Sequence, residues 1–137
     1  MKELRAADIK LVFEQDIKMA LYTLDRYGIE ANMALIACDD YDIDKAHLIE
    51  SVRYSDVAKK INDHYLAVLF TFVDHIGAKC ALEKLIDRYP EYHLRGSLVI
   101  LQKGESIDMV CERLATANAF IHKDPVNKIF LEFDRKG

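Results

Sequence analysis

The chain has 137 residues, 51% of them hydrophobic, and a formal net charge of −4 at pH 7. This length suits one domain over residues 1–137, and the hydrophobic share is sufficient for a buried core. The mildly acidic balance gives no electrostatic footprint for DNA or RNA. The first residues lack the apolar stretch of a signal peptide, and no apolar run is long enough to span a bilayer. These features predict a cytoplasmic protein without a membrane or nucleic-acid partner.

Three cysteines, Cys38, Cys80 and Cys111, are scattered along the chain without a C-x-x-C pair. An odd, scattered set is typical of reduced thiols in a cytosol. Each lies within a largely apolar segment, so we expect all three to be core residues rather than nucleophiles.

The first half of the chain predicts a helix, a buried strand and a short second helix. Residues 3–27 carry apolar side chains at helical spacing, and Gly28 supplies a stop. The unbroken apolar run at 31–39 is typical of a central strand buried on both faces. An acidic turn then leads into a short helix within 39–53, with Asp42 or Asp44 as its expected N-cap.

The second half begins with a β-hairpin over residues 57–70, whose turn is predicted at Asn62-Asp63. A helix follows at 75–89, with Asp74 near its cap and Pro90 beyond its end. A strand at 94–102, a helix at 105–123 and a last strand at 127–133 complete the order. A hairpin amid alternating helices and strands excludes a purely parallel sheet. It predicts an α+β palm: a mixed, mainly antiparallel sheet of about five strands with helices on its faces.

The order of several sequence segments indicates a protein family as well as a fold class. The long helix ends in "RYG", and the buried strand ends in acidic residues, "MALIACDDYD". After these come "RYSD", five residues, the hairpin "NDHYL", the apolar "AVLF", and later "RGSLVIL" and "NKIF". In this order and texture nearly the whole chain resembles a GGDEF domain, the family of diguanylate cyclases. The resemblance implies a nucleotidyl-cyclase-like palm and a bacterial signalling context.

The residues that the family uses for catalysis are replaced in this chain. Diguanylate cyclases join two GTP molecules, and phosphoryl transfer of this kind needs divalent metals held by carboxylates. The resemblance aligns the first-strand carboxylate position with Ala37 and the hairpin glutamate position with Tyr65. Asp39 lies two residues further on, about 6–7 Å along a strand, so it does not simply replace the missing ligand.

The signature hairpin is altered as well, over Asn62, Asp63, His64, Tyr65 and Leu66. The family's glycines let phosphates approach a bare backbone, but Asn62 and Asp63 bring side chains to those positions. The segment between the first strand and the hairpin is also shorter than in the family and lacks its guanine-contacting texture. The sequence therefore predicts a degenerate module that is not an enzyme, with no catalytic residues, no metal and no cofactor.

Arg53-x-x-Asp56 stands where active cyclases often carry an inhibitory site for cyclic di-GMP, so the resemblance implies a possible ligand site at these two residues. An arginine fork suits a guanine edge or a phosphate, and an aspartate accepts from guanine N–H groups. By composition alone, roughly 0.7 such motifs are expected by chance, and Arg5-x-x-Asp8 is a second one. The alternative is an ordinary surface ion pair, which contributes little.

Other readings of the polar residues have less support. The loop "DDYDID" lacks the glycine and the final glutamate of a calcium loop, and the five histidines show no zinc spacing with any cysteine. His64 and Tyr65 are either recognition residues or the rim of a hairpin. Three functions remain open: a cyclic di-GMP receptor, a protein-interaction or homodimerisation module without a nucleotide, and a residual nucleotidyl cyclase, which has the least support.

Overall fold

The computed structural model describes residues 4–39, 42, 57–124 and 126–134. Its five strands form one sheet in the order β2-β3-β1-β4-β5. Only the β4–β5 pair is parallel, and the other three pairs are antiparallel. The strands are β1 (Ala31–Cys38), β2 (Val57–Asn62), β3 (Tyr65–Thr71), β4 (Leu94–Ile100) and β5 (Ile129–Leu131). The predicted α+β architecture with a mixed, mainly antiparallel sheet is confirmed.

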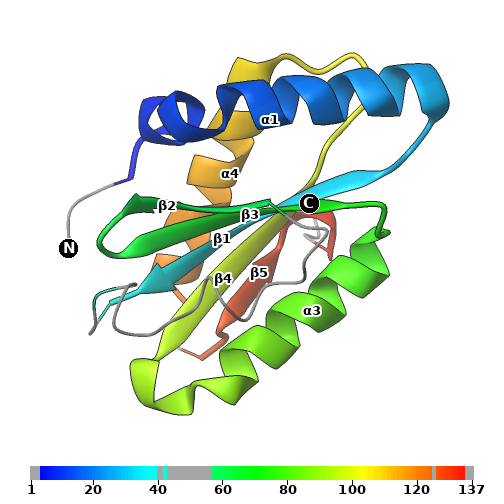
Figure 1. The fold of residues 1–137 in the computed structure, drawn as a ribbon. Coiled ribbons are helices and arrows are strands. Elements are labelled where there is room, and N and C mark those ends of the chain that lie inside the picture. The colour runs from blue at the N-terminus through cyan, green and yellow to red at the C-terminus, as the bar shows by residue number, and fades with distance from the viewer. Residues whose placement is uncertain (1–3, 40–41, 43–56, 125, 135–137) are drawn as a thin grey trace.

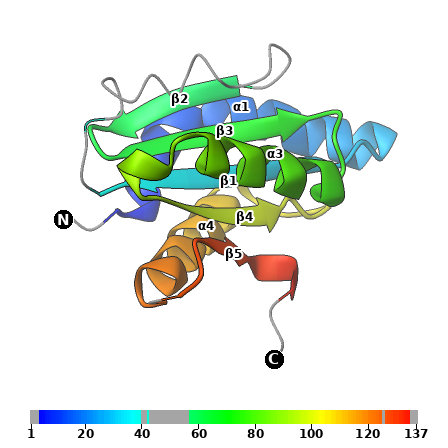
Figure 2. The ribbon, with the colours of Figure 1, turned by 90° about the horizontal axis from the view of Figure 1, so that it is seen from below.

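In the described part of the chain, three long helices cover the two faces of this sheet, as Figure 1 illustrates. They are α1 (Ala6–Tyr27), α3 (His75–Arg88) and α4 (Ile107–His122), and two short 3-10 helices, η2 (Pro90–Tyr92) and η3 (Glu132–Asp134), follow α3 and β5. Helices α1 and α4 pack on one face and α3 packs on the other, as the view from below also shows (Figure 2). The sheet therefore has two separate cores, which we call the α1/α4 face and the α3 face.

Helix α1 buries the stripe that its sequence spacing predicts. Its buried positions are Ile9, Phe13, Ile17, Ala20 and Leu21. Gly28 ends the helix in the left-handed region, with φ 68°, and its N–H donates to the carbonyl of Leu24 at 2.9 Å. A side chain is disfavoured in that conformation, so glycine is the residue that suits this stop.

The hairpin is present, but its turn lies one residue later than the sequence suggests. Asn62 still pairs with Tyr65, and Asp63 and His64 form the turn. The Asn62 Oδ1 atom accepts from the backbone N–H groups of His64 and Tyr65, at 2.9 and 3.1 Å. Asn62 therefore secures the turn from the strand end, as short polar side chains often do.

The ends of the later elements differ from expectation by one to three residues. Asp74 caps α3 by accepting from the N–H of Gly77, which confirms its predicted place. Helix α4 begins only at Ile107, because Ser106 caps it by accepting from Met109. Strand β5 is shorter than predicted because the chain turns into η3 at Glu132, whose carboxylate binds Arg113.

One expectation about the cysteines is wrong. Cys38 and Cys111 are buried, but Cys80 is exposed on the outer side of α3. Its neighbours in sequence are apolar, yet the helical period places position 80 away from the sheet. The short helix expected within 39–53 falls almost wholly outside the described residues, as does Asp44. None of the described helices is both long and apolar enough to cross a membrane.

Candidate functional site beside the hairpin

The two positions that the resemblance aligns with metal-binding carboxylates are neighbours in space. Ala37 near the end of β1 and Tyr65 at the start of β3 are direct cross-strand partners. Their side chains are 0% and 2% exposed, and both belong to the core of the α1/α4 face. Residues two apart on a strand share a face, so Asp39, beyond the end of β1, follows Ala37 on this side of the sheet.

The Tyr65 hydroxyl group is the centre of a buried polar cluster. It lies 3.1 Å from His122 Nε2 and 3.5 Å from the Asn118 amide nitrogen, which donates to it. The rings of Tyr65 and His122 meet edge to face, with centroids 6.1 Å apart. Both partners come from the last two turns of α4, one turn apart, so the helix brings them over the same strand end.

Burial shifts the pKa values of Tyr65 and His122 in the directions that favour their uncharged forms. Burial raises the pKa of Tyr65, and the hydrogen bond from Asn118 partly offsets that rise. Burial lowers the pKa of His122, and the positive charge of Arg95 lowers it further, against an opposing effect of Asp39. At neutral pH the phenol and the imidazole are therefore both uncharged, and the phenol can donate to the ring nitrogen.

Arg95 of β4 connects the ends of three elements around this cluster. Its guanidinium donates to the carbonyls of Ile121 and Asp124, at 3.1 and 3.4 Å, which fixes the end of α4. Its Nε lies 3.7 Å from the Asp39 carboxylate. The other Asp39 oxygen is buried and has no hydrogen-bond partner among the described residues, and the same holds for the Asn118 side-chain oxygen. Unpaired buried acceptors cost free energy, and two of the four such oxygens among the described residues lie together in this polar cluster, which makes it the candidate site.

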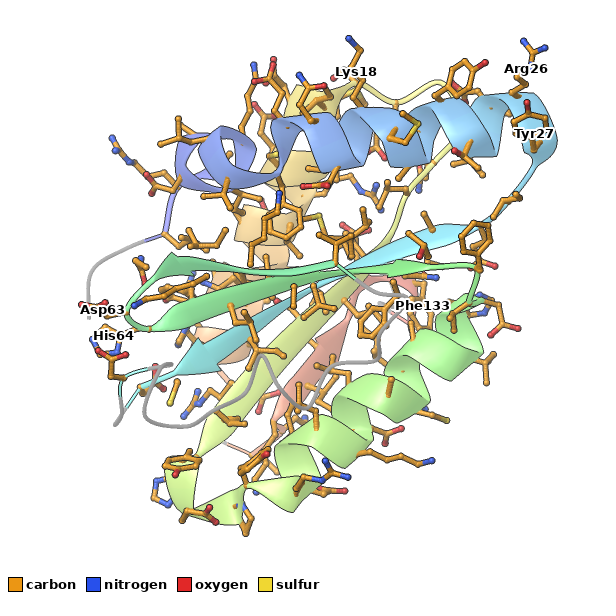
Figure 3. All side chains as sticks on the ribbon, viewed as in Figure 1. Lys18, Arg26, Tyr27, Asp63, His64 and Phe133 are labelled. Atoms are coloured by element: carbon orange, nitrogen blue, oxygen red, sulfur yellow. The ribbon has the colours of Figure 1, made fainter. Side chains whose placement is uncertain are left out.

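The polar side chains at the hairpin tip, Asp63 and His64 (Figure 3), contact the hairpin itself and the adjacent end of β1. Asp63 is exposed and pairs with Lys60 at 3.1 Å. The His64 ring lies 3.0 Å from the carbonyl oxygen of Cys38, so it ties the hairpin to the end of β1. Leu66 is fully buried on the opposite, α3 face. Among the five residues of the altered signature hairpin, Tyr65 is the one that joins the polar cluster.

Sequence reasoning missed two members of the cluster and named two residues that cannot be placed. Asn118 and His122 carry the contacts to Tyr65, although the sequence offers a signal: two polar residues four apart in an otherwise apolar helical stripe. Arg53 and Asp56, the predicted ligand pair, lie outside the described residues. In the described part of the chain, no three His, Cys, Asp or Glu side chains gather as a metal site would require.

The site does not fit the magnesium ions that the family resemblance implies. Ala37 offers no donor atom, and the Tyr65 phenol is protonated and already hydrogen-bonded by α4. Hard cations need carboxylate oxygens in a compact set. The nearby Asp39 carboxylate is beside the cation of Arg95 instead. At the two positions that the resemblance assigns to metal-binding carboxylates, this chain has an alanine and a neutral phenol that contacts an imidazole and an amide.

Comparisons with known proteins support the fold rather than a close relationship. No protein-family model matches this sequence. No curated protein matches it either. Among solved structures, the GGDEF domain of DgcB from Caulobacter crescentus, in complex with c-di-GMP, superposes with a TM-score of 0.72 at 14% identity. That match covers 89% of this chain and 89% of the DgcB chain.

Two further structures agree with this result. The diguanylate cyclase SiaD from Pseudomonas aeruginosa, in complex with its activator SiaC, gives a TM-score of 0.72 at 12% identity, over 89% of this chain and 57% of SiaD. A microbial GGDEF domain studied with cyclic di-GMP gives 0.71 at 12% identity, over 90% and 92% of the two chains. The chain therefore has a GGDEF-like fold, as its sequence order predicted.

Proposed function

We propose that this chain is a GGDEF-like regulatory module that does not catalyse the cyclase reaction. The observation that carries the proposal is the Ala37–Tyr65 pair, buried at neighbouring positions of β1 and β3. A methyl group and a hydrogen-bonded phenol occupy the positions that the resemblance assigns to metal-binding carboxylates. Without carboxylates at these two positions, the palm lacks the ligands that the resemblance assigns to the metal ions of the triphosphate.

The proposal is tested by incubating the protein with GTP and Mg²⁺ or Mn²⁺ and separating the nucleotides by chromatography. We expect no cyclic di-GMP and no pyrophosphate above the level of a protein-free sample. The double variant Ala37→Asp/Tyr65→Glu is the matched comparison, because it returns two carboxylates to adjacent strands. Product formed by the wild-type protein, and lost on adding EDTA, would refute the proposal.

A finer proposal concerns the ligand: cyclic di-GMP bound through Arg53 and Asp56. It rests on the register of Arg53-x-x-Asp56 before the hairpin, and on the fact that two of the similar structures are GGDEF domains with c-di-GMP. Calorimetry with cyclic di-GMP should show binding by the wild type and loss in Arg53→Ala. Arg88→Ala is the matched control, since Arg88 is an exposed arginine at the end of α3. An absence of heat with the wild-type protein removes the ligand but leaves the non-catalytic proposal intact.

A second candidate function is a protein-interaction or homodimerisation module. One observation favours it: the outer side of α1 exposes Leu11, Met19 and Tyr22, at 86%, 65% and 53%. The helical period puts them on the same side as Lys18, which points away from the sheet (Figure 3). This candidate predicts self-association in light scattering that Leu11→Glu abolishes. A protein that stays monomeric at every concentration and captures no partner would exclude it.

A further inference from the structure

A large cavity in the described part of the chain lies beside the polar cluster, not at the hairpin tip. It opens between the start of α1 and the second half of α4, and its volume is about 830 Å³. Known ligand pockets span roughly 300–1,000 Å³, so its size suits a small organic molecule. It lies on the α1/α4 face of the sheet.

The cavity has an apolar wall and a polar, uncharged floor. Leu4 and the small side chains Ala115 and Ala119 form part of the wall. Tyr65, Asn118 and His122 also line it, and these form the hydrogen-bonded cluster described above. Small residues on two facing helices leave room that larger side chains would fill. An apolar wall with a few convergent polar groups is the usual composition of a small-molecule site.

The floor has one unmet hydrogen-bonding requirement. Asn118 is only 5% exposed, and its side-chain oxygen has no partner among the described residues. The amide nitrogen is already directed at Tyr65. The oxygen is itself buried, so a ligand N–H or O–H group would reach it once the Asn118 side chain turns, and the contact would recover the free energy lost by its burial.

The rim of the cavity adds positive charge. Arg5 at the start of α1 and Lys123 just beyond α4 line it from opposite elements, together with the carboxylate of Glu112. Arg5 also lies 3.6 Å from Asp8, and 75% of its side chain is exposed. Because Asp8 already pairs with Arg5 and Glu112 is also present, an anionic group at the mouth would be attracted mainly by Lys123, and only modestly in high dielectric.

We propose that this cavity binds a small organic anion with an apolar body and a hydrogen-bond donor, without a metal ion. The apolar body packs on the alanine wall, the donor faces Asn118, and the anionic group stays at the rim with Lys123 and Arg5. The proposal is independent of Arg53 and Asp56 and of any turnover of GTP, so either proposal can fail alone.

The test uses a dye pair that matches this chemistry. Anilinonaphthalene sulfonate has an aromatic body, one N–H donor and one sulfonate, and N-phenyl-1-naphthylamine is its counterpart without the charge. We expect saturable binding of one sulfonated dye per chain, with fluorescence enhancement unchanged by EDTA. Circular dichroism on the same sample must show a cooperative thermal transition, because unfolded intermediates also bind this dye.

Variants then locate the site. Ala119→Trp and Thr116→Trp add bulk at exposed cavity positions, and each should weaken both dyes by at least about tenfold while the fold is retained. Lys123→Gln should weaken the sulfonated dye by about two- to fivefold and leave the neutral dye unchanged. Lys103→Gln, an exposed lysine in the turn after β4, is the matched control for which no change is expected.

Two results would overturn the proposal. One is the absence of saturable dye binding by the folded wild-type protein. The other is binding that persists at full affinity in both tryptophan variants, since the dye would then occupy another surface. If one tryptophan variant does not fold, the other still decides the question.

Discussion

The two faces of the sheet differ in how closely their helices pack against it. On the α3 face, Leu82 and Ile86 pack directly over Gly96, where an added Cβ would lie only 3.1 Å from a side-chain carbon of each. On the α1/α4 face, two helices share the sheet, and the space between them contains the Tyr65 cluster and the large cavity. One helix in close contact gives a tight aliphatic core, whereas two helices leave a gap that polar groups line. We therefore expect the α3 face to contribute mainly to stability and the α1/α4 face to provide the space for a ligand.

The largest expected loss of stability comes from a substitution on the α3 face. Leu82 is fully buried among aliphatic side chains. Leu82→Ala should lower the free energy of unfolding by about 3 kcal/mol through lost burial and a residual cavity. Urea denaturation measures this value, and dye binding on the other face should be unchanged. Leu11→Ala, at an 86% exposed position of α1, is the control and should change stability by less than about 0.5 kcal/mol.

The next effect is expected at the polar anchor that ties α4 to β4 and η3. Arg113 donates to both Glu105 oxygens, at 2.8 and 2.7 Å, and also to the carbonyl of Ile100. The Glu105 side chain is only 2% exposed. Arg113→Met should cost about 2 kcal/mol, because the buried Glu105 carboxylate loses its cation and keeps the N–H of Gln102 as a donor. Stability that recovers in part in the double variant Arg113→Met/Glu105→Met would confirm this cause, whereas a larger loss would contradict it.

A smaller effect is expected at the candidate site. Tyr65→Phe keeps the ring but removes the hydroxyl that His122 and Asn118 contact. It should lower the free energy of unfolding by about 1–2 kcal/mol, since two partly buried partners lose a hydrogen bond. The loss should be smaller than that of Leu82→Ala in the same urea series. An unchanged midpoint would show that the cluster contributes nothing to stability.

The smallest expected effect is a pH dependence of stability that comes from His122 on the α1/α4 face. The unfolded imidazole titrates near 6.5, and burial lowers the pKa of His122 in the folded state. Between these two values the unfolded chain binds more protons, so the contribution of His122 is full above pH 6.5 and declines as pH falls through the folded pKa. His122→Gln should remove this slope from the urea midpoint measured against pH. A slope equal to that of the wild type would mean that other groups produce it.

The sequence predicted the elements well because their signals are local. The apolar stripe of α1, the stop at Gly28, the cap at Asp74 and the continuous apolar run of β1 each follow from a few adjacent residues. The errors have different causes. The end of β5 depends on where Glu132 meets Arg113, and no local pattern reveals that contact. The start of α4 is set by the Ser106 cap, a local signal. Cys80 was misplaced because apolar neighbours in sequence do not share its side of the helix.

By itself, the sequence determined the order of helices and strands, the GGDEF-like fold and the presence of alanine and tyrosine at positions 37 and 65, because these depend on residue identity and short-range periodicity. Only the tertiary structure decided that Ala37 and Tyr65 are direct partners, that α4 brings Asn118 and His122 to the same phenol, and that a cavity opens beside them. The contact between Tyr65 and His122, for example, joins residues 57 positions apart. The path of the chain sets their distances, and no short stretch of sequence contains that information.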